Sequence, residues 1–404
     1  MPTNMRRSRA GAISAARKRH DQQNATEPPF QSVALVVGCT GIVGTSLVDI
    51  LPLPDTPGGP WKVYALSRRP FPPWSPPPSP AVTHLHLDLA DSAAVAEALA
   101  PLTDITHVFY VAWAPHFVED QNREANTGML RNLLSVVVPN CPALVHVSLQ
   151  TGLKHYMGPP ESIGKFAIGT PFSEDMPRLP DCPNFYYDQE DVLFDAVSRR
   201  RISWSVHRPS LIFGFSPRSA MNVVCTLCVY AAICRKEGNK LRWPGSLGAW
   251  EGFSNASDAD LIAEQHIWAA VDVAAKNQAF NCSNGDIYKW KQLWPVLAGR
   301  FGLEWSGYEG EESRVGLMEA MEGKDAVLAE IVREEGLVVT ELEEVASWWF
   351  VDALFMDKWE FLDTMNKSKE HGFMGFRNTV KSFQTWIDRM KLYKISPIEV
   401  FNRD

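Results

Sequence analysis

Three glycines spaced three residues apart, Gly38, Gly41 and Gly44, give the strongest chemical signal in the sequence. They follow an apolar run that predicts a strand and open a segment that predicts a helix. Gly38 permits a tight turn, Gly41 lets the backbone approach a pyrophosphate, and Gly44 lets the helix pack closely on the strand. Free amides at the helix N-terminus favour phosphate oxygens. The segment therefore predicts a nucleotide-binding turn, with a purely structural glycine turn as the alternative.

Two arginines, Arg68 and Arg69, stand at the end of the second predicted strand, where the adenosine ribose of a bound dinucleotide lies. An enzyme that uses NAD places an acid there to accept from the 2'-hydroxyl group. Guanidinium groups instead bind a 2'-phosphate through charge-assisted hydrogen bonds. We therefore expect NADPH as the cofactor, with an ordinary basic turn as the alternative. Asp88 and Leu89, after the third predicted strand, are expected to contact adenine, with a simple loop-opening aspartate as the alternative.

The glycine spacing is typical of short-chain dehydrogenases, which commonly carry a tyrosine and, four residues later, a lysine on the same helix face. That pair is missing here, because Glu190 follows Tyr186 at this spacing and Asp191 follows Tyr187. The residues alone therefore predict NADP binding and leave the reaction open.

Short apolar strands that alternate with longer helical segments position these residues, and this order predicts a doubly wound, mainly parallel α/β sheet of the Rossmann type. The predicted strands are Val33–Val37, Trp61–Ser67, Val82–Leu87, His107–Trp113, Leu144–Gln150 and Ile202–His207. The predicted helices between them include Ile42–Leu51, Ala93–Leu99 and Glu124–Val138.

The chain divides into three predicted parts. Residues 1–30 form a basic tail that we expect to be disordered, 31–215 an NADP-binding Rossmann domain, and 216–404 a largely helical substrate-binding or lid region. We expect a cytoplasmic protein, with organellar targeting by the basic tail as the alternative. The sequence leaves the oligomeric state open, a homodimer included.

The composition restricts the function further. With 404 residues, 45% of them hydrophobic, and a net charge of −8, the chain has the composition of a globular protein and offers no general basic face to nucleic acid. The longest apolar run, Val223–Cys234, is too short for a bilayer span. Cys225 and Cys228 lie within it, and we interpret them as buried helix thiols rather than a redox or zinc pair. No metal site is predicted.

Several blocks of the sequence resemble the family of plant progesterone 5β-reductases and iridoid synthases. The resemblance covers about residues 32–398 and rests on segments 148–159, 184–191, 204–209, 213–217, 257–264 and 366–373, among them Ser-Leu-Gln-Thr-Gly-Leu-Lys-His-Tyr-Met-Gly-Pro and Asn-Phe-Tyr-Tyr-Asp-Gln-Glu-Asp.

The resemblance implies that Tyr186 and Lys154, 32 positions apart, are the catalytic residues. Without it, a packed aromatic side chain and a surface charge would be the simpler interpretation. It also implies that Phe350 lines the substrate pocket. The cofactor contacts that it implies are Thr40, Gly41, Ile42, Arg68, Arg69, Asp88, Leu89, Trp113, Gln150, Tyr186, Ile212, Ser219, Ala220 and Met221.

The activity that the resemblance implies is the NADPH-dependent 1,4-reduction of an enone. The expected substrates are 3-oxo-Δ4-steroids such as progesterone, reduced to 5β products, together with smaller enones. One alternative is the reductive cyclisation of 8-oxogeranial, as in iridoid synthases. Another is a non-catalytic NADP-sensing protein, which would keep the glycine turn but need neither Tyr186 nor Lys154.

Three departures from the family pattern bear on specificity. Pro160 replaces a phenylalanine of the pocket wall, Ser210 and Leu211 replace a small residue and an asparagine, and Ala220 replaces a methionine of the cofactor segment. The first is expected to reshape the mouth of the substrate pocket, whereas the reaction type is untouched.

Overall fold

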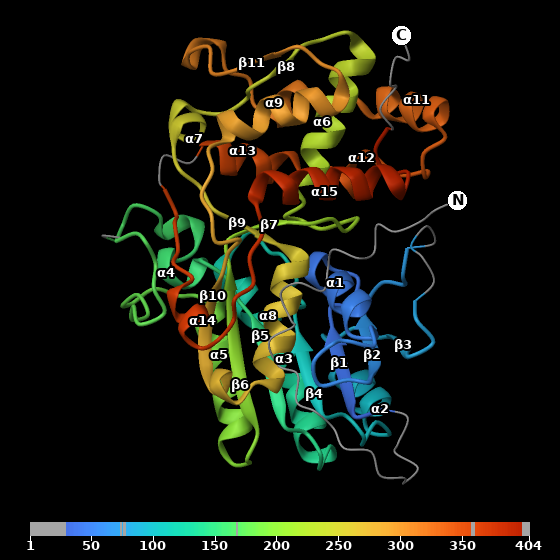
Figure 1. Ribbon diagram of the computed structural model, residues 1–404, viewed down its shortest axis with the longest axis vertical. Coiled ribbons are helices and arrows are strands. Elements are labelled where there is room, and N and C mark those ends of the chain that lie inside the picture. The colour runs from blue at the N-terminus through green and yellow to red at the C-terminus, as the bar shows by residue number, and fades with distance from the viewer. Residues whose placement is uncertain (1–29, 73–74, 76–77, 167–168, 357–359, 398–404) are drawn as a thin grey trace.

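Seven parallel strands form the central sheet of the protein, in the order β10-β6-β5-β4-β1-β2-β3 (Figure 1). The computed structural model describes residues 30–397 apart from 73–74, 76–77, 167–168 and 357–359. The strands of the sheet are β1 (Ser32–Val37), β2 (Trp61–Ser67), β3 (Val82–His86), β4 (His107–Tyr110), β5 (His146–Gln150), β6 (Ser203–Pro209) and β10 (Gln278–Cys282). The predicted doubly wound α/β fold is confirmed, and each of the six predicted strands is present.

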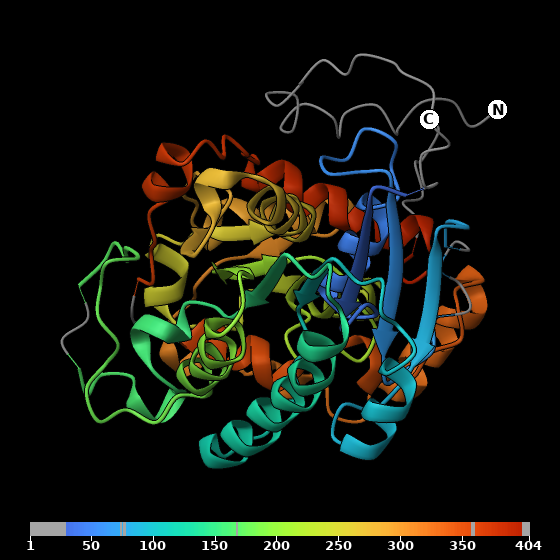
Figure 2. The same ribbon diagram turned by 90° about the horizontal axis from the view of Figure 1, so that it is seen from below.

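Helices cover both faces of this sheet (Figure 2). Ala34 and Val36 of β1 pack in a cluster with α1 (Ile42–Ile50) and α8 (Ala259–Val271). Leu35 and Val37 point the other way, into a cluster with α2 (Ser92–Leu99), α3 (Glu119–Asn140) and α5 (Phe185–Ser198). Because successive side chains of a strand point to opposite faces, an apolar strand such as β1 requires cover on both sides.

A largely helical layer lies over the carboxyl ends of the strands (Figure 1). Its core contains α6 (Val223–Glu237), α9 (Trp290–Phe301), α13 (Trp348–Met356) and α15 (Thr379–Leu392). The apolar run noted in the sequence forms α6, and Cys225 and Cys228 are buried in it as free thiols. The remaining elements are α4 (Lys154–Met157), β7 (Leu211–Phe213), β8 (Leu241–Arg242), α7 (Leu247–Glu251), β9 (Ala256–Asp258), β11 (Trp305–Ser306), α10 (Leu317–Ala320), α11 (Asp325–Glu335), α12 (Leu342–Val345) and α14 (Asn366–Glu370).

The two layers are not divided at residue 215. The segment from β9 to β10 returns to the sheet, where α8 packs beside α1 and β10 pairs with β6. The predicted boundary at residue 215 places this segment in the C-terminal part, because the last strand predicted from the sequence is Ile202–His207. The Rossmann layer is therefore discontinuous in the sequence.

Acidic residues at the start of α8 hold the helical layer on the sheet. Asp258 accepts hydrogen bonds from Ser382 and from the Trp386 indole of α15. Two residues further on, Asp260 pairs with Arg389, which also belongs to α15. These contacts explain why acids occur at this position, in one of the segments that resemble the reductase family.

The sheet has its topological switch point between β1 and β4. Connections from these two neighbouring strands run to opposite sides, which opens a crevice at their carboxyl ends where ligands bind in such sheets. Among the described residues, no helix is long and apolar enough to span a membrane. The predicted basic tail, apart from Phe30, lies outside the described residues.

Candidate active site

The glycine turn connects β1 to α1 at this crevice. Gly38 has φ of +89°, and a Cβ there would lie 2.8 Å from the Cα of Ala112 after β4. Gly41 is the N-cap of α1 and no side chain caps the helix. A Cβ on Gly44 would lie 2.0 Å from the carbonyl oxygen of Gly38. Both the positive φ and the two close approaches require glycine, so the turn leaves room for a phosphate beside the first amides of α1.

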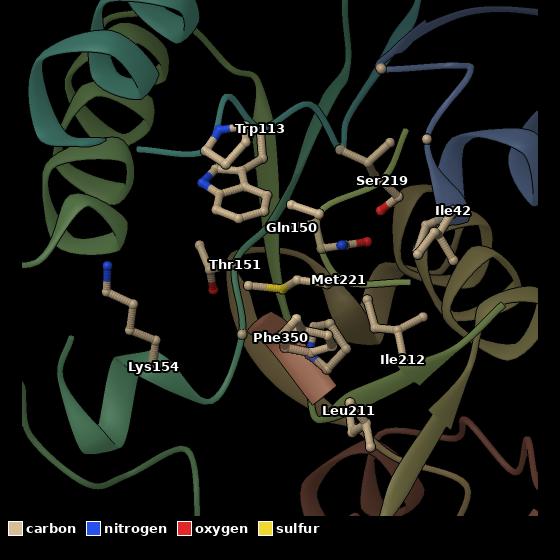
Figure 3. A pocket seen from close by; sticks show the side chains of 18 of the residues that line it. Ile42, Trp113, Gln150, Thr151, Lys154, Leu211, Ile212, Ser219, Met221 and Phe350 are labelled. Carbon is tan, nitrogen blue, oxygen red and sulfur yellow. The ribbon is translucent and has the colours of Figure 1, made fainter. Parts of the chain in front are cut away.

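A cavity of about 710 Å³ begins at this turn and extends between the sheet and the helical layer. It has the volume of a small-molecule site. Figure 3 shows Trp113, Gln150, Met221 and Phe350 around its interior, with Lys154 approaching from one side and Ile42 from the other. The residues predicted to contact the cofactor line it, namely Gly38, Thr40, Gly41, Ile42, Arg68, Arg69, Asp88, Leu89, Trp113, Gln150, Tyr186, Ile212, Ser219, Ala220 and Met221. Gly44 does not line the cavity, because it lies behind the turn, against the backbone of Gly38 and Cys39.

Four buried polar atoms in this lining have no hydrogen-bond partner among the described residues: the Nε1 of Trp113, the Oε1 of Gln150, the Oδ1 of Asn255 and the hydroxyl of Tyr288. A buried polar group without a partner costs free energy. Trp113 follows β4 at the switch point, and Gln150 ends the neighbouring strand β5, at the edge of the sheet where a dinucleotide lies in Rossmann folds. A donor and an acceptor in this position fit a polar cofactor.

Arginines gather at the end of the cavity where β2 and β3 stop. Arg68 is exposed and lies 3.9 Å from the carboxylate of Asp88. Arg69 donates to the carbonyl oxygen of Arg218, at 3.4 Å. Burial lowers the pKa of Arg69, and the charges of Arg68 and Arg218 lower it further. Three neighbouring guanidinium groups favour an anionic group at this end of the cavity.

Arg218 is a residue that the sequence did not reveal. It follows the Phe-Gly-Phe-Ser-Pro segment, has φ of +59°, and pairs with Glu344 of α12. Arg218 and Arg69 are 149 residues apart in the sequence, and only the fold brings them together. No short motif could have signalled it.

The structure brings Tyr186 and Lys154 together at the wall of the cavity. The Nζ of Lys154 lies 5.6 Å from the centre of the Tyr186 ring, and both residues line the cavity. Lys154 is the first residue of α4 and Tyr186 the second of α5. The hydroxyl of Tyr186 faces the backbone of Gly152, where an added Cβ would come within 3.2 Å of it.

Asn184 holds these two short segments to each other. Its Oδ1 accepts from the amide of Tyr186 at 3.1 Å, which caps α5, while its Nδ2 donates to the carbonyl oxygen of Lys154 at 2.9 Å. An asparagine at an N-cap is a common helix start. Here the same side chain also fixes the distance between the two segments.

Glu119, at the start of α3, completes this group and was not identified from the sequence. One carboxylate oxygen pairs with the ammonium of Lys154, and the other accepts from the amide of Phe185 at 2.7 Å. The predicted helix began at Glu124, which left Glu119 in a loop. The adjacent acids Glu119 and Asp120 were the available signal, because acids are favoured in the first turn of a helix.

The surroundings shift both titrating groups of the pair. Burial raises the pKa of the Tyr186 phenol well above its usual value, and the carboxylate of Glu119 raises it further. Burial lowers the pKa of Lys154, whereas the hydrogen bond and charge of Glu119 oppose that shift. At neutral pH the phenol is therefore protonated and can donate a hydrogen bond into the cavity.

Glu190 occupies the helix position at which short-chain dehydrogenases carry a lysine. It is buried and pairs with Arg208 and Arg178, each at 3.0 Å, and with His155 at 3.3 Å. Burial raises its pKa, but His155 and Arg208 outweigh that effect and hold the value at about 2. This carboxylate therefore serves an internal ion-pair network, and the lysine comes from α4 instead.

The departures from the family pattern fall in different places. Ser210, Leu211 and Ala220 line the cavity, and so does Phe350. Pro160 is exposed and is not among the lining residues, so the expected effect of this residue on the pocket mouth is not seen. Among the described residues, no cluster of His, Cys, Asp and Glu has the arrangement of a metal site.

Comparison with known proteins identifies the family of the chain. Residues 34–397 match the model of the PRISE-like Rossmann-fold domain. The chain is 55% identical to an (S)-8-oxocitronellyl enol synthase of Nepeta cataria and 54% identical to a 3-oxo-Δ4,5-steroid 5β-reductase of Arabidopsis thaliana, each match covering 96% of this chain and 99% of the relative.

Similar solved structures are more distant in sequence. The UDP-glucose 4-epimerase of Thermus thermophilus, in complex with NAD, superposes with a TM-score of 0.59 at 16% identity, over 89% of this chain and 99% of that one. A short-chain dehydrogenase/reductase superfamily protein of Agrobacterium tumefaciens with bound NAD gives a TM-score of 0.57 at 14% identity, over 90% and 99%. At sequence identities this low, the similarity shows only that the folds are alike.

Proposed function

Because the chain belongs to the PRISE-like Rossmann-fold family, we propose that it is an NADPH-dependent reductase of enones, with 3-oxo-Δ4-steroids such as progesterone as substrates and 5β-steroids as products. The observation that carries the proposal is the meeting of Tyr186 and Lys154 in the cavity that begins at the glycine turn. Relatives that match nearly the whole chain at 54–55% identity include a steroid 5β-reductase and an enol synthase.

The proposed chemistry uses a neutral phenol. When bound, NADPH supplies a hydride to the β-carbon of the enone, and negative charge then develops on the carbonyl oxygen. The protonated hydroxyl of Tyr186 donates a hydrogen bond to that oxygen, and the ammonium of Lys154 adds positive potential from the same side. Loss of one such donor typically costs about 100-fold to 1,000-fold in turnover.

Arg68 and Arg69 support NADPH over NADH. The acid that would accept from the 2'-hydroxyl of NADH is absent from the end of β2, and Arg218 adds a third guanidinium beside Arg69. A 2'-phosphate is a doubly charged group that such a cluster binds well.

An alternative substrate class keeps the same residues. Reductive formation of an enol from 8-oxogeranial, followed by cyclisation, needs the same hydride addition and the same donor. The relative from Nepeta cataria supports this alternative about as strongly as the Arabidopsis relative supports a steroid, because the two match the chain about equally closely. A non-catalytic NADP-sensing protein is disfavoured, since it would not need a phenol and an ammonium beside each other in the cavity.

The test is turnover of each substrate by the purified protein. NADPH consumption is followed by its absorbance with progesterone or 8-oxogeranial, and chromatography gives the stereochemistry of the product. Tyr186→Phe should lose most of the turnover while it still binds NADPH. Tyr308→Phe, which changes a tyrosine paired with Glu311 at the surface, is the matched control. Undiminished turnover of Tyr186→Phe would refute the role of the phenol.

A further inference from the structure

The carboxylate of Glu119 joins the two segments that carry the reactive pair. It is the first residue of α3, and only 9% of its surface is exposed. Its two oxygens have different partners: Oε2 pairs with Lys154 of α4, and Oε1 accepts from the amide of Phe185, the first residue of α5. One side chain therefore contacts the lysine and the helix that carries Tyr186.

This carboxylate lies where positive charge converges. The free amides and positive dipole ends of α3 and α5 meet at it, and α5 has 14 residues. The ammonium of Lys154 lies 4.2 Å from the centre of the Phe185 ring, so it is enclosed on that side by an aromatic face. A buried charge is tolerated when it is paired and hydrogen-bonded, and here the carboxylate and ammonium satisfy each other.

The pairing changes what Lys154 does to its neighbour. An ammonium alone beside a phenol favours the phenolate, which is a base. An ammonium paired with a carboxylate favours the phenolate less, so the phenol keeps its proton while part of the positive potential of Lys154 still acts on the carbonyl oxygen. Reduction of an enone needs a hydrogen-bond donor at the carbonyl oxygen, whereas oxidation of an alcohol needs a base.

We infer that Glu119 is a positioning residue that fixes Lys154 beside Tyr186 and keeps Tyr186 a neutral hydrogen-bond donor. The inference rests on the proposed enone reduction for its chemistry, but the coupling of the three side chains is a property of the folded protein. The direction of the pKa shifts agrees, because Glu119 raises both the pKa of Tyr186 and that of Lys154.

The other acidic groups near the pair are weaker candidates for this role. Glu161, in the short turn after α4, and Cys182, in the loop before α5, also raise the pKa of Lys154. Glu161 is exposed and has no contact with the ammonium. On the outer side of the two helices, Asp188 of α5 is paired with Arg123 of α3 at 2.7 Å. Glu119 is the carboxylate that contacts Lys154.

The first experiment compares Glu119→Gln with Glu161→Gln. The glutamine keeps an oxygen acceptor for the amide of Phe185 but removes the charge. In Glu119→Gln, the fall of kcat at high pH should move to lower pH by about one unit or more, because a proton leaves the pair more readily. Glu161→Gln should shift the profile much less, because Glu161 acts on Lys154 only through its charge and makes no ion pair with it. A purely structural role would lower kcat at all pH values and leave the position of this fall unchanged, and that result would overturn the inference.

The second experiment needs no turnover. The rate at which an amine-reactive reagent labels Lys154 is measured by mass spectrometry as a function of pH. Labelling requires the neutral amine, so in Glu119→Gln the pH midpoint of labelling should fall by about one unit or more, with a much smaller fall in Glu161→Gln. An unshifted midpoint overturns the inference even if the protein reduces enones. A shifted midpoint in a protein that reduces no enone supports the coupling and refutes the proposed function instead.

Discussion

Replacement of Gly44 by alanine tests the cofactor site through geometry alone. The added Cβ would lie 2.0 Å from the carbonyl oxygen of Gly38 and 2.8 Å from the Cα of Cys39. Both atoms belong to the backbone, so the clash cannot be relieved by rotation of a side chain. To restore even the shortest real contact, about 3.0 Å, the turn and α1 must separate by about 1 Å.

This separation falls between the turn and the first amides of α1, which are the two parts of the proposed phosphate site. Overpacking of this kind costs about 1–3 kcal/mol of stability, and the turn would no longer be aligned with the amides of α1. We expect the Kd for NADPH to rise at least about tenfold, which corresponds to about 1.4 kcal/mol. Calorimetric titration with NADPH gives the Kd, and thermal unfolding gives the stability.

Gly128→Ala is the matched control. Gly128 lies within α3, and a Cβ there would have no neighbour within 4 Å. Alanine is favoured over glycine in a helix interior by about 1 kcal/mol, so this variant should be slightly stabilised and should bind NADPH normally. If Gly44→Ala binds NADPH as the wild type does, the assignment of the turn to the phosphates is refuted.

Three further predictions concern other parts of the molecule. The double change Arg68→Ala and Arg69→Ala should raise the Kd for NADPH far more than that for NADH in the same titration, and equal losses would show that the 2'-phosphate is not bound there. Burial lowers the pKa of His207 to about 4 from 6.5, so unfolding takes up a proton between these values and stability falls as the pH drops through this range. In urea unfolding of the wild type, this group should lower the free energy of unfolding by on the order of 2 kcal/mol between pH 7 and pH 5. His207→Gln should reduce this pH dependence, and the exposed control His116→Gln should leave it unchanged. The hydroxyl of Tyr288, which lines the cavity, is buried without a partner among the described residues. Tyr288→Phe should therefore not lower the melting temperature of the protein without substrate, and a destabilised variant would contradict this prediction. The same variant should raise KM for substrates that carry a polar group at the end remote from the enone.

The local signals in the sequence predicted the Rossmann half of the fold well. A strand that is apolar at nearly every position needs helices on both faces of its sheet, and the glycine turn directly follows such a strand in a Rossmann fold. Both features can therefore be recognised within short segments of the sequence. The boundary at residue 215 was not readable in this way. The pairing of β10 with β6 depends on a crossover through α8, and nothing local in Gln278–Cys282 marks its partner.

The sequence by itself determined the chemistry available to this protein: a phosphate-binding turn, two arginines beyond the second strand, and, through its resemblance to a family, a tyrosine and a lysine. Only the tertiary structure decided which groups act together. It placed Glu119 against Lys154 and Arg218 beside Arg69, contacts that span 35 and 149 residues of chain. Local propensity acts within a few residues, whereas electrostatic pairing acts between whatever atoms the packed sheet and helices bring within a few ångströms.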